Sequence, residues 1–147
     1  MKLAILTPNL SALPEPTADE IGELADRGYR SIIGNRPDGE APGQPTWNDL
    51  KAAALARGLE AVHIPVVASQ IDEADIRAFR EALERLPKPI AAFCRTGTRS
   101  TLLWALANEA SLTVDERIKI AAKEGYDLEP FRGLLEGATG APASKIA

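Results

Sequence analysis

The segment from Phe93 to Ser100 holds the residues of this chain whose types and spacing are best suited to chemistry. Cys94 follows a short apolar run and precedes a stretch with helical character. A loop between a strand and a helix N-terminus presents backbone N–H groups and the positive end of the helix dipole, so a thiolate placed there is stabilised. We therefore expect Cys94 to act as a nucleophile. A buried structural cysteine is the alternative, but it would not require the arginines and the glycine that follow.

The residues after the cysteine suggest a cradle for an anion. Gly97 lets the backbone curl so that successive amides converge. Arg99 can place a guanidinium fork on an oxyanion or on a terminal sulfur. Ser100 could donate to the cysteine sulfur or cap the helix, and the sequence leaves both roles open. The remaining candidates for anion binding in the loop are Arg95, Thr96 and Thr98, of which Arg95 could instead only solvate the loop.

Four residues outside the loop are further candidates. Arg36 and Asp38 lie in a segment rich in proline and glycine that follows an expected strand, where loops line the crevice of a parallel sheet. Arg36 could contact substrate, or the two could form an ion pair that stiffens the loop. Asp72 could be a general acid, but an N-cap opposite Asp75 is the favoured role. We expect His63, the one histidine, to be half-buried and hydrogen-bonded.

The elements that must position these residues alternate between strands and helices, which predicts an α/β domain with a mainly parallel sheet flanked by helices. Helices are expected over about 17–27, 46–57, 72–86, 100–109, 114–123 and 128–136. Strands are expected over 29–33, 61–66 and 89–93, and the first strand lies over either 3–6 or 10–13. The cysteine would then end the third of these later strands and face the start of a helix.

Composition narrows the classes of protein. The 147 residues, with 45% hydrophobic residues and a net charge of −4, fit one globular domain over 1–137 and a frayed tail over 138–147. No basic stripe suggests nucleic acid as a partner, and no apolar run suggests a membrane span. A single cysteine excludes an internal disulfide and a Cys/His metal cluster, so we expect no metal and no cofactor. A cytoplasmic location fits these features.

Several motifs resemble known families. Cys94–Ser100 resembles the active-site loop shared by rhodaneses and cysteine-dependent phosphatases. The family that more of the chain resembles, over about residues 10–135, is the phosphatase-like domain of beta-lactamase hydrolase-like proteins. The motifs that carry this resemblance are Asn35–Glu40, Pro42–Pro45, His63–Val66, Leu103-Trp104 and Gly125–Leu128. It implies a three-layer fold of the dual-specificity phosphatase type. Some members are fused to, or encoded beside, a persulfide dioxygenase of the metallo-beta-lactamase fold, which implies a dioxygenase partner in sulfide and persulfide metabolism.

Two departures from the phosphatase pattern separate the possible chemistries. Phosphatases of this fold carry five residues between Cys and Arg, whereas four stand between Cys94 and Arg99, as in a rhodanese. Phosphatases also place an Asp soon after the strand that ends like Ile64–Val66, and here no Asp appears before Asp72. General acids contribute about 10²–10⁴-fold. We therefore rank sulfur transfer from a small anionic donor first, phosphomonoester hydrolysis second, and a non-catalytic anion-binding module third.

Overall fold

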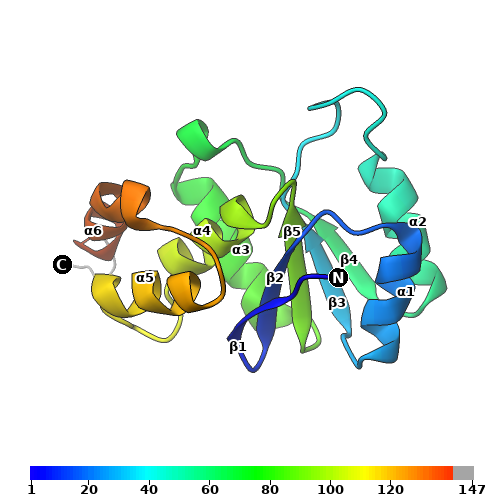
Figure 1. Ribbon diagram of the computed structural model, residues 1–147, viewed down its shortest axis with the longest axis horizontal. Helices are drawn as coiled ribbons and strands as arrows, with labels where there is room; N and C mark the ends of the chain where they lie inside the picture. Colours follow the sequence, from blue (N-terminus) through cyan, green and yellow to red (C-terminus); the bar gives the residue numbers. More distant parts are fainter. Residues whose placement is uncertain (141–147) are drawn as a thin grey trace.

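A five-stranded sheet lies at the centre of the fold, with helices on both of its faces (Figure 1). The computed structural model describes residues 1–140. The strand order is β1-β2-β5-β3-β4, and every neighbouring pair except β1–β2 is parallel. The strands are β1 (Ala4–Thr7), β2 (Leu10–Pro14), β3 (Ser31–Gly34), β4 (Glu60–His63) and β5 (Ile90–Cys94). The predicted α/β class with a mainly parallel sheet is confirmed.

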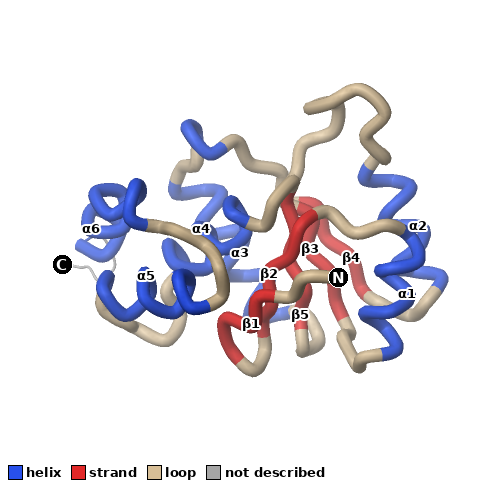
Figure 2. The backbone as a smooth tube through the Cα atoms, viewed as in Figure 1, coloured by secondary structure: helices blue, strands red, loops and turns tan. Residues whose placement is uncertain are grey.

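The helices divide into two groups, one for each face of the sheet (Figure 2). The helices are α1 (Ala18–Asp26), α2 (Trp47–Ala56), α3 (Glu73–Arg85), α4 (Thr98–Ala107), α5 (Val114–Lys123) and α6 (Arg132–Gly140), with short 3₁₀ turns η1 (Ala68–Gln70) and η2 (Glu129–Phe131). Side chains alternate along β5: Phe93 packs with the α1 and α2 residues, and Ala92 packs with α3 and α4. This period of two lets one strand serve both cores.

Side-chain caps begin the helices where the sequence predicts them. Reciprocal capping boxes join Thr17 with Glu20, Asp72 with Asp75 and Thr113 with Glu116, and Thr46 caps α2. Each cap satisfies backbone N–H groups that have no partner within the helix. The starts of these four helices are therefore confirmed by the structure.

Other boundaries differ from the prediction. Both candidate first strands exist, because 4–7 and 10–14 pair with each other as an antiparallel hairpin. β4 ends at His63, since Pro65 has no N–H with which to continue the ladder. The stretch 128–136 divides into η2 and α6, and α6 continues to Gly140, into the segment expected to fray. Residues 141–147 of that expected tail lie outside the described residues.

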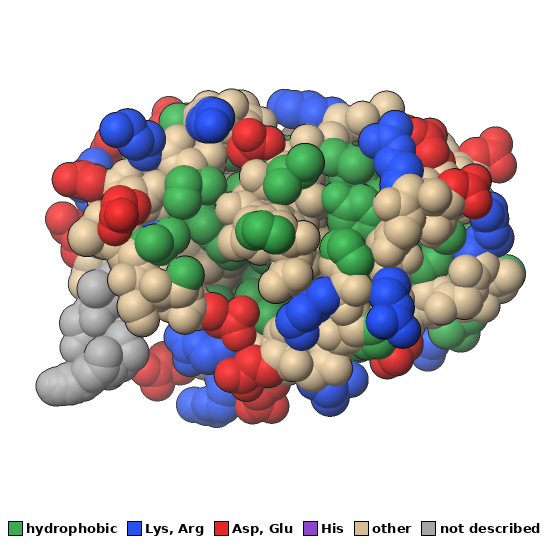
Figure 3. Space-filling view, turned by 90° about the horizontal axis from the view of Figure 1, so that it is seen from below, with side chains coloured by type: hydrophobic (Ala, Val, Ile, Leu, Met, Phe, Trp, Pro, Cys, Tyr) green, Lys and Arg blue, Asp and Glu red, His purple; other side chains and the backbone are tan. Residues whose placement is uncertain are grey.

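The topology brings four loops to one edge of the sheet. The parallel strands β2, β3, β4 and β5 all end at the upper edge in Figure 1, where ligand crevices of such sheets form. The opposite edge, seen from below in Figure 3, carries charged side chains of both signs around an apolar centre, without a continuous basic stripe on that face. Within residues 1–140 no helix is long and apolar enough to cross a bilayer.

Candidate active site

Cys94 is the last residue of β5 and is almost fully buried, with 1% of its surface exposed. Its Sγ accepts hydrogen bonds from the backbone N–H of Gly97 at 3.1 Å and of Arg99 at 3.2 Å. These amides belong to the N-cap and the first turn of α4, so the sulfur lies at the positive end of a ten-residue helix. Hydrogen bonds from backbone amides favour a thiolate over a thiol. The helix begins two residues earlier than predicted, and this places the loop directly against its N-terminus.

The carbonyl groups of the same loop face away from the sulfur. Those of Arg95, Thr96 and Gly97 accept hydrogen bonds from Glu15 N, Tyr126 Oη and Thr101 N, at 3.4, 2.8 and 3.0 Å respectively. In a trans peptide the N–H points opposite to the C=O, so carbonyls held outward turn the intervening amides inward. The loop can therefore present several N–H donors to one anionic group.

Gly97 is required by its backbone and its surroundings. Its φ of +98° is unfavourable for residues with a side chain. A Cβ atom at this position would also lie 2.1 Å from Tyr126 Oη. Both facts fit the predicted role of Gly97 in curling the loop.

Arg99 points across the site to Glu40. Its Nη1 donates to Glu40 Oε2 at 2.7 Å and to the Val66 carbonyl at 2.9 Å, and its Nη2 donates to Glu40 Oε1 at 2.9 Å. Hydrogen bonding with Arg99 is the main cause that lowers the pKa of Glu40, and the same bond is the main cause that raises the pKa of Arg99. The negative charge at Cys94 raises the pKa of Arg99 further.

This ion pair belongs to a longer network. Arg36, with 8% of its side chain exposed, bonds through Nε to Glu40 and through Nη1 to Glu15, both at 3.1 Å. The network therefore runs from Glu15 through Arg36 and Glu40 to Arg99. Of the two roles that the sequence left open for Arg36, the ion pair with Asp38 does not form, because Arg36 pairs with Glu15 and Glu40. Instead, Asp38 Oδ1 accepts from Trp47 N at 2.8 Å and so fixes the end of its loop at the start of α2.

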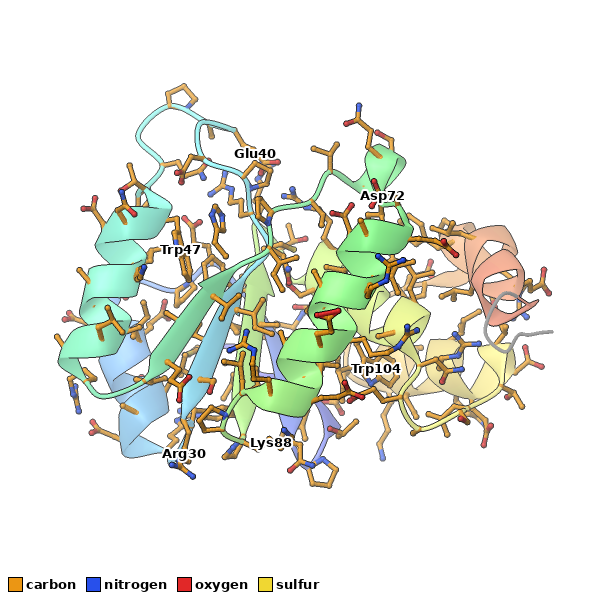
Figure 4. The ribbon with its side chains drawn as sticks, turned by 180° about the vertical axis from the view of Figure 1, so that it is seen from behind. Arg30, Glu40, Trp47, Asp72, Lys88 and Trp104 are labelled. Atoms are coloured by element: carbon orange, nitrogen blue, oxygen red, sulfur yellow. The ribbon has the colours of Figure 1, made fainter. Side chains whose placement is uncertain are left out.

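A cavity of about 500 Å³ lies beside the loop. It is lined by Arg36, Glu40, Ala41, Pro42, Arg95 and Arg99. Three arginines face one carboxylate, so the lining favours an anionic ligand. Figure 4 shows Glu40 at the end of the molecule opposite to Arg30 and Lys88.

The hydroxyl groups in and beside the loop are hydrogen-bonded within the protein, one of them to a distant residue. Ser100 Oγ donates to Asn35 Oδ1 at 2.8 Å, and Asn35 Nδ2 donates to the Ile64 carbonyl at 2.8 Å. Ser100 thus ties α4 to the ends of β3 and β4. This role differs from the two that the sequence left open, which were donation to the cysteine sulfur and capping of the helix. Thr96 Oγ1 donates to Thr98 Oγ1 at 3.1 Å, which pairs the two threonines within the loop.

Asp72 and His63 serve the scaffold. Asp72 is exposed, and its Oδ1 accepts from Asp75 N at 2.9 Å at the start of α3, which is the favoured capping role (Figure 4). His63 is half-buried, bonds through Nε2 with the Arg36 carbonyl at 3.0 Å, and stacks on Trp47 with ring centroids 4.8 Å apart. Within residues 1–140, no group of three or more His, Cys, Asp or Glu side chains is arranged to hold a metal ion.

Glu40, Asn35 and Tyr126 are parts of this site that the sequence alone does not identify. Glu40 and Arg99 are 59 residues apart, and the signals for Glu40 were its place in the proline- and glycine-rich loop with Arg36 and in the Asn35–Glu40 motif. Asn35 and Tyr126 also stand in motifs that carry the family resemblance, but the partners of all three residues depend on how distant elements pack. No local pattern encodes such contacts.

The similarity to curated relatives covers most of this chain but only part of the length of each relative. A beta-lactamase hydrolase-like protein from Xylella fastidiosa is 38% identical over 130 residues, which are 87% of this chain and 30% of the relative. The chain thus spans about three-tenths of the length of the curated relatives it matches.

Solved structures agree with the fold. A candidate phosphatase from Neisseria meningitidis is 35% identical, with a TM-score of 0.86 over 94% of this chain and 99% of its own. TpbA from P. aeruginosa, solved with phosphotyrosine, is 14% identical with a TM-score of 0.72 over 98% and 91% of the two chains, a likeness of fold. The predicted cysteine-phosphatase-like fold is confirmed.

The family comparison covers the elements that build the site. The model described as "Beta-lactamase hydrolase-like protein, phosphatase-like domain" matches residues 2–111, which include the loops after β2, β3, β4 and β5 and the whole of α4. Since this match takes in more than half of the sequence, the chain belongs to the phosphatase-like domain family of beta-lactamase hydrolase-like proteins.

Proposed function

We propose that this protein is a thiol-dependent hydrolase of phosphomonoesters, with Cys94 as the nucleophile. The observation that carries the proposal is the pair of amide hydrogen bonds from Gly97 and Arg99 to the Cys94 sulfur at the N-terminus of α4. The related candidate phosphatase from N. meningitidis supports the same class of reaction. Phosphate hydrolysis is thereby ranked ahead of sulfur transfer, although the four-residue spacing and the missing Asp after the strand place sulfur transfer first on the sequence alone.

The reaction would proceed in two displacements. The Cys94 thiolate attacks phosphorus, the S–P bond forms, and the P–O bond to the leaving group breaks, with the electron pair going to that oxygen. Water then attacks the cysteinyl phosphate, which releases inorganic phosphate and restores the thiolate. The inward amides of the loop donate to the equatorial oxygens in both transition states.

Arg99 would supply the remaining positive charge. A guanidinium carries five N–H groups, and the bonds to Glu40 and Val66 use three of them. The other two are left for the sulfur and for a substrate oxygen. Glu40 fixes the plane of the fork, so the orientation of Arg99 is set before an anion arrives.

Leaving-group protonation is the weak point of this reaction in this site. Among the described residues, the carboxylates of the neighbouring loops that could serve already have partners: Glu40 bonds to Arg99, Asp38 to Trp47 N and Asp72 to Asp75 N. The leaving group of an aryl phosphate departs as a phenolate, whose negative charge the ring stabilises. Hydrolysis of aryl phosphomonoesters therefore depends least on a general acid, and these are the substrates we propose.

Sulfur transfer is the second candidate. The partnered carboxylates favour it, because this reaction needs no general acid. With thiosulfate, the Cys94 thiolate attacks the sulfane sulfur, a new S–S bond forms, and sulfite leaves with the electron pair of the broken bond. An acceptor thiolate then attacks the outer sulfur of the persulfide, and Cys94 returns as a thiolate. No proton donor is needed. A dioxygenase partner would belong to this second function.

One comparison tests both functions. Specificity constants for an aryl phosphate, and for thiosulfate with a thiol acceptor, are measured on one preparation, with Cys94→Ser as the control. The proposal expects the aryl phosphate constant to be the larger and Cys94→Ser to be inactive. A larger constant for thiosulfate, with one sulfur atom added to Cys94 in the intact mass, would establish sulfur transfer instead. No turnover of either substrate would leave anion binding alone.

A further inference from the structure

Tyr126 lies beneath the cysteine loop although it is far from it in the sequence. It follows α5, only 5% of its surface is exposed, and its Oη donates to the Thr96 carbonyl at 2.8 Å. The family model ends at residue 111, so Tyr126 comes from a part of the chain that this match does not cover.

The bond made by Tyr126 acts on the peptide group that touches the sulfur. The carbonyl of the Thr96–Gly97 peptide accepts from Tyr126, and the N–H of the same peptide donates to Cys94 Sγ at 3.1 Å. This peptide is trans, so the two groups point in opposite directions and turn together. A donor on the carbonyl also polarises the amide and strengthens the bond that its N–H makes.

We propose that Tyr126 is a positioning residue that sets the reactivity of the Cys94 thiolate by fixing and polarising the Gly97 amide. The inference rests on the proposed function only in that Cys94 is the reacting group. Tyr126 touches the loop from outside and acts through the peptide.

Two further observations support this role. The position that a Cβ of Gly97 would occupy lies 2.1 Å from Tyr126 Oη, so the tyrosine packs directly on the peptide that it anchors. Burial, followed by the negative charge at Cys94, raises the pKa of Tyr126 above its ordinary value. The phenol therefore stays protonated at neutral pH and remains a donor.

Among the described residues, charged groups face Tyr126 and Cys94 from the N-terminal segment, from α4 and from the loop after β3. Lys2 Nζ lies 4.9 Å from the centre of the Tyr126 ring, and Arg99 is coupled to the charge at Cys94. Glu40 bonds to Arg99, and through Arg36 this network continues to Glu15. A change at the Tyr126 hydroxyl leaves all of these charges in place.

The test uses alkylation of Cys94, which needs no substrate. Because the chain has one cysteine, the rate with iodoacetamide reports on this residue alone. Tyr126→Phe keeps the ring and removes the donor. We expect alkylation to be about threefold to tenfold slower on the rising part of the profile of rate against pH, which moves to higher pH, and an unchanged limiting rate at high pH, consistent with the loss of one hydrogen bond.

Tyr29→Phe is the matched control. Tyr29 is also partly buried and its hydroxyl bonds to Ser11 Oγ at 2.6 Å, while the neighbouring Arg30 lies at the end of the molecule opposite to Glu40 (Figure 4). This variant should keep the wild-type profile. Superimposable profiles for wild type and Tyr126→Phe, or equal displacement in both variants, would overturn the proposal.

A second measurement works even where Tyr126→Phe folds poorly. In the Tyr29→Phe background, 3-fluorotyrosine enters position 126 alone, since the chain has two tyrosines. Fluorination makes the phenol a stronger donor, so the profile should move to lower pH, opposite to the effect of Phe. An unchanged profile would refute the polarising role. Absence of turnover with both substrate classes, together with these two displacements, would contradict the proposed function and leave the role of Tyr126 standing.

Discussion

Glu40 and Arg99 form a two-pronged ion pair across the candidate active site, with Nη1–Oε2 and Nη2–Oε1 distances of 2.7 and 2.9 Å. The pair joins the loop after β3 to the first turn of α4. Bidentate geometry fixes the plane of the guanidinium as well as its position. The carboxylate therefore orients the arginine, but it also brings a negative charge close to the place where an anionic substrate would bind.

Replacing Glu40 by Gln separates these two effects. The amide keeps the size and one acceptor but removes the charge, so Arg99 is held less firmly. We expect kcat to fall about tenfold, because orientation of the fork is lost in the transition state. Inorganic phosphate should inhibit the variant at least as strongly as the wild type, because the negative charge of Glu40 no longer repels it. Steady-state kinetics with phosphate as inhibitor measure both, and an unchanged kcat would show that Glu40 does not position Arg99.

The same pair predicts how stability depends on pH. Hydrogen bonding with Arg99 lowers the pKa of folded Glu40 below its ordinary value of 4.5. A lowered pKa contributes stability above the unfolded value, and this contribution is lost as the pH falls through the folded value. The difference in unfolding free energy between wild type and Glu40→Gln should be constant above about pH 5.5 and shrink below about pH 4.5. Denaturant titrations from pH 3.5 to 7 check this, and a constant difference would contradict it.

Arg99→Lys tests the fork without removing the charge. Lysine presents a point charge that cannot bond to both Glu40 oxygens and the Val66 carbonyl in one plane. We expect kcat/KM to fall about tenfold to a hundredfold, because the planar fork that faces the transition state is lost. The melting temperature should change little, because the lysine stem can pack where the arginine side chain, about 14% exposed, now packs. Wild-type kinetics in this variant would remove Arg99 from the reaction.

Asp72 is expected to affect stability rather than turnover. Its carboxylate caps α3, and asparagine can cap in the same way. Asp72→Asn should therefore keep both activity and stability, whereas Asp72→Ala should lose about 1 kcal/mol of stability with normal kinetics. A loss of about 10²-fold in turnover of an aryl phosphate by Asp72→Asn would establish it as the general acid.

Local chemistry explains which parts of the molecule could be predicted. The capping box of Thr17 and Glu20, the glycine at position 28 and the cysteine between strand and helix are contained in a few adjacent residues, and the structure has them as expected. The partners of Arg36 and Ser100 could not be obtained in this way. Each depends on which loops meet at the edge of the sheet, which is a property of strand order rather than of neighbouring residues.

The dependence on the leaving group tests the proposed reaction most directly. The carboxylates beside the loop within residues 1–140 already have partners, so negative charge is expected to build up on the departing oxygen in the transition state. For a series of substituted phenyl phosphates, kcat/KM should therefore fall steadily as the pKa of the phenol rises, and alkyl phosphates should be hydrolysed at least about 10²-fold more slowly than phenyl phosphate. The specificity constant kcat/KM reports only the steps up to the first displacement. Slow hydrolysis of the cysteinyl phosphate therefore does not hide the dependence on the phenol. A kcat/KM that is independent of the phenol would mean that an acid protonates the leaving group, and the bonds made by Glu40, Asp38 and Asp72 would then have to rearrange when substrate binds.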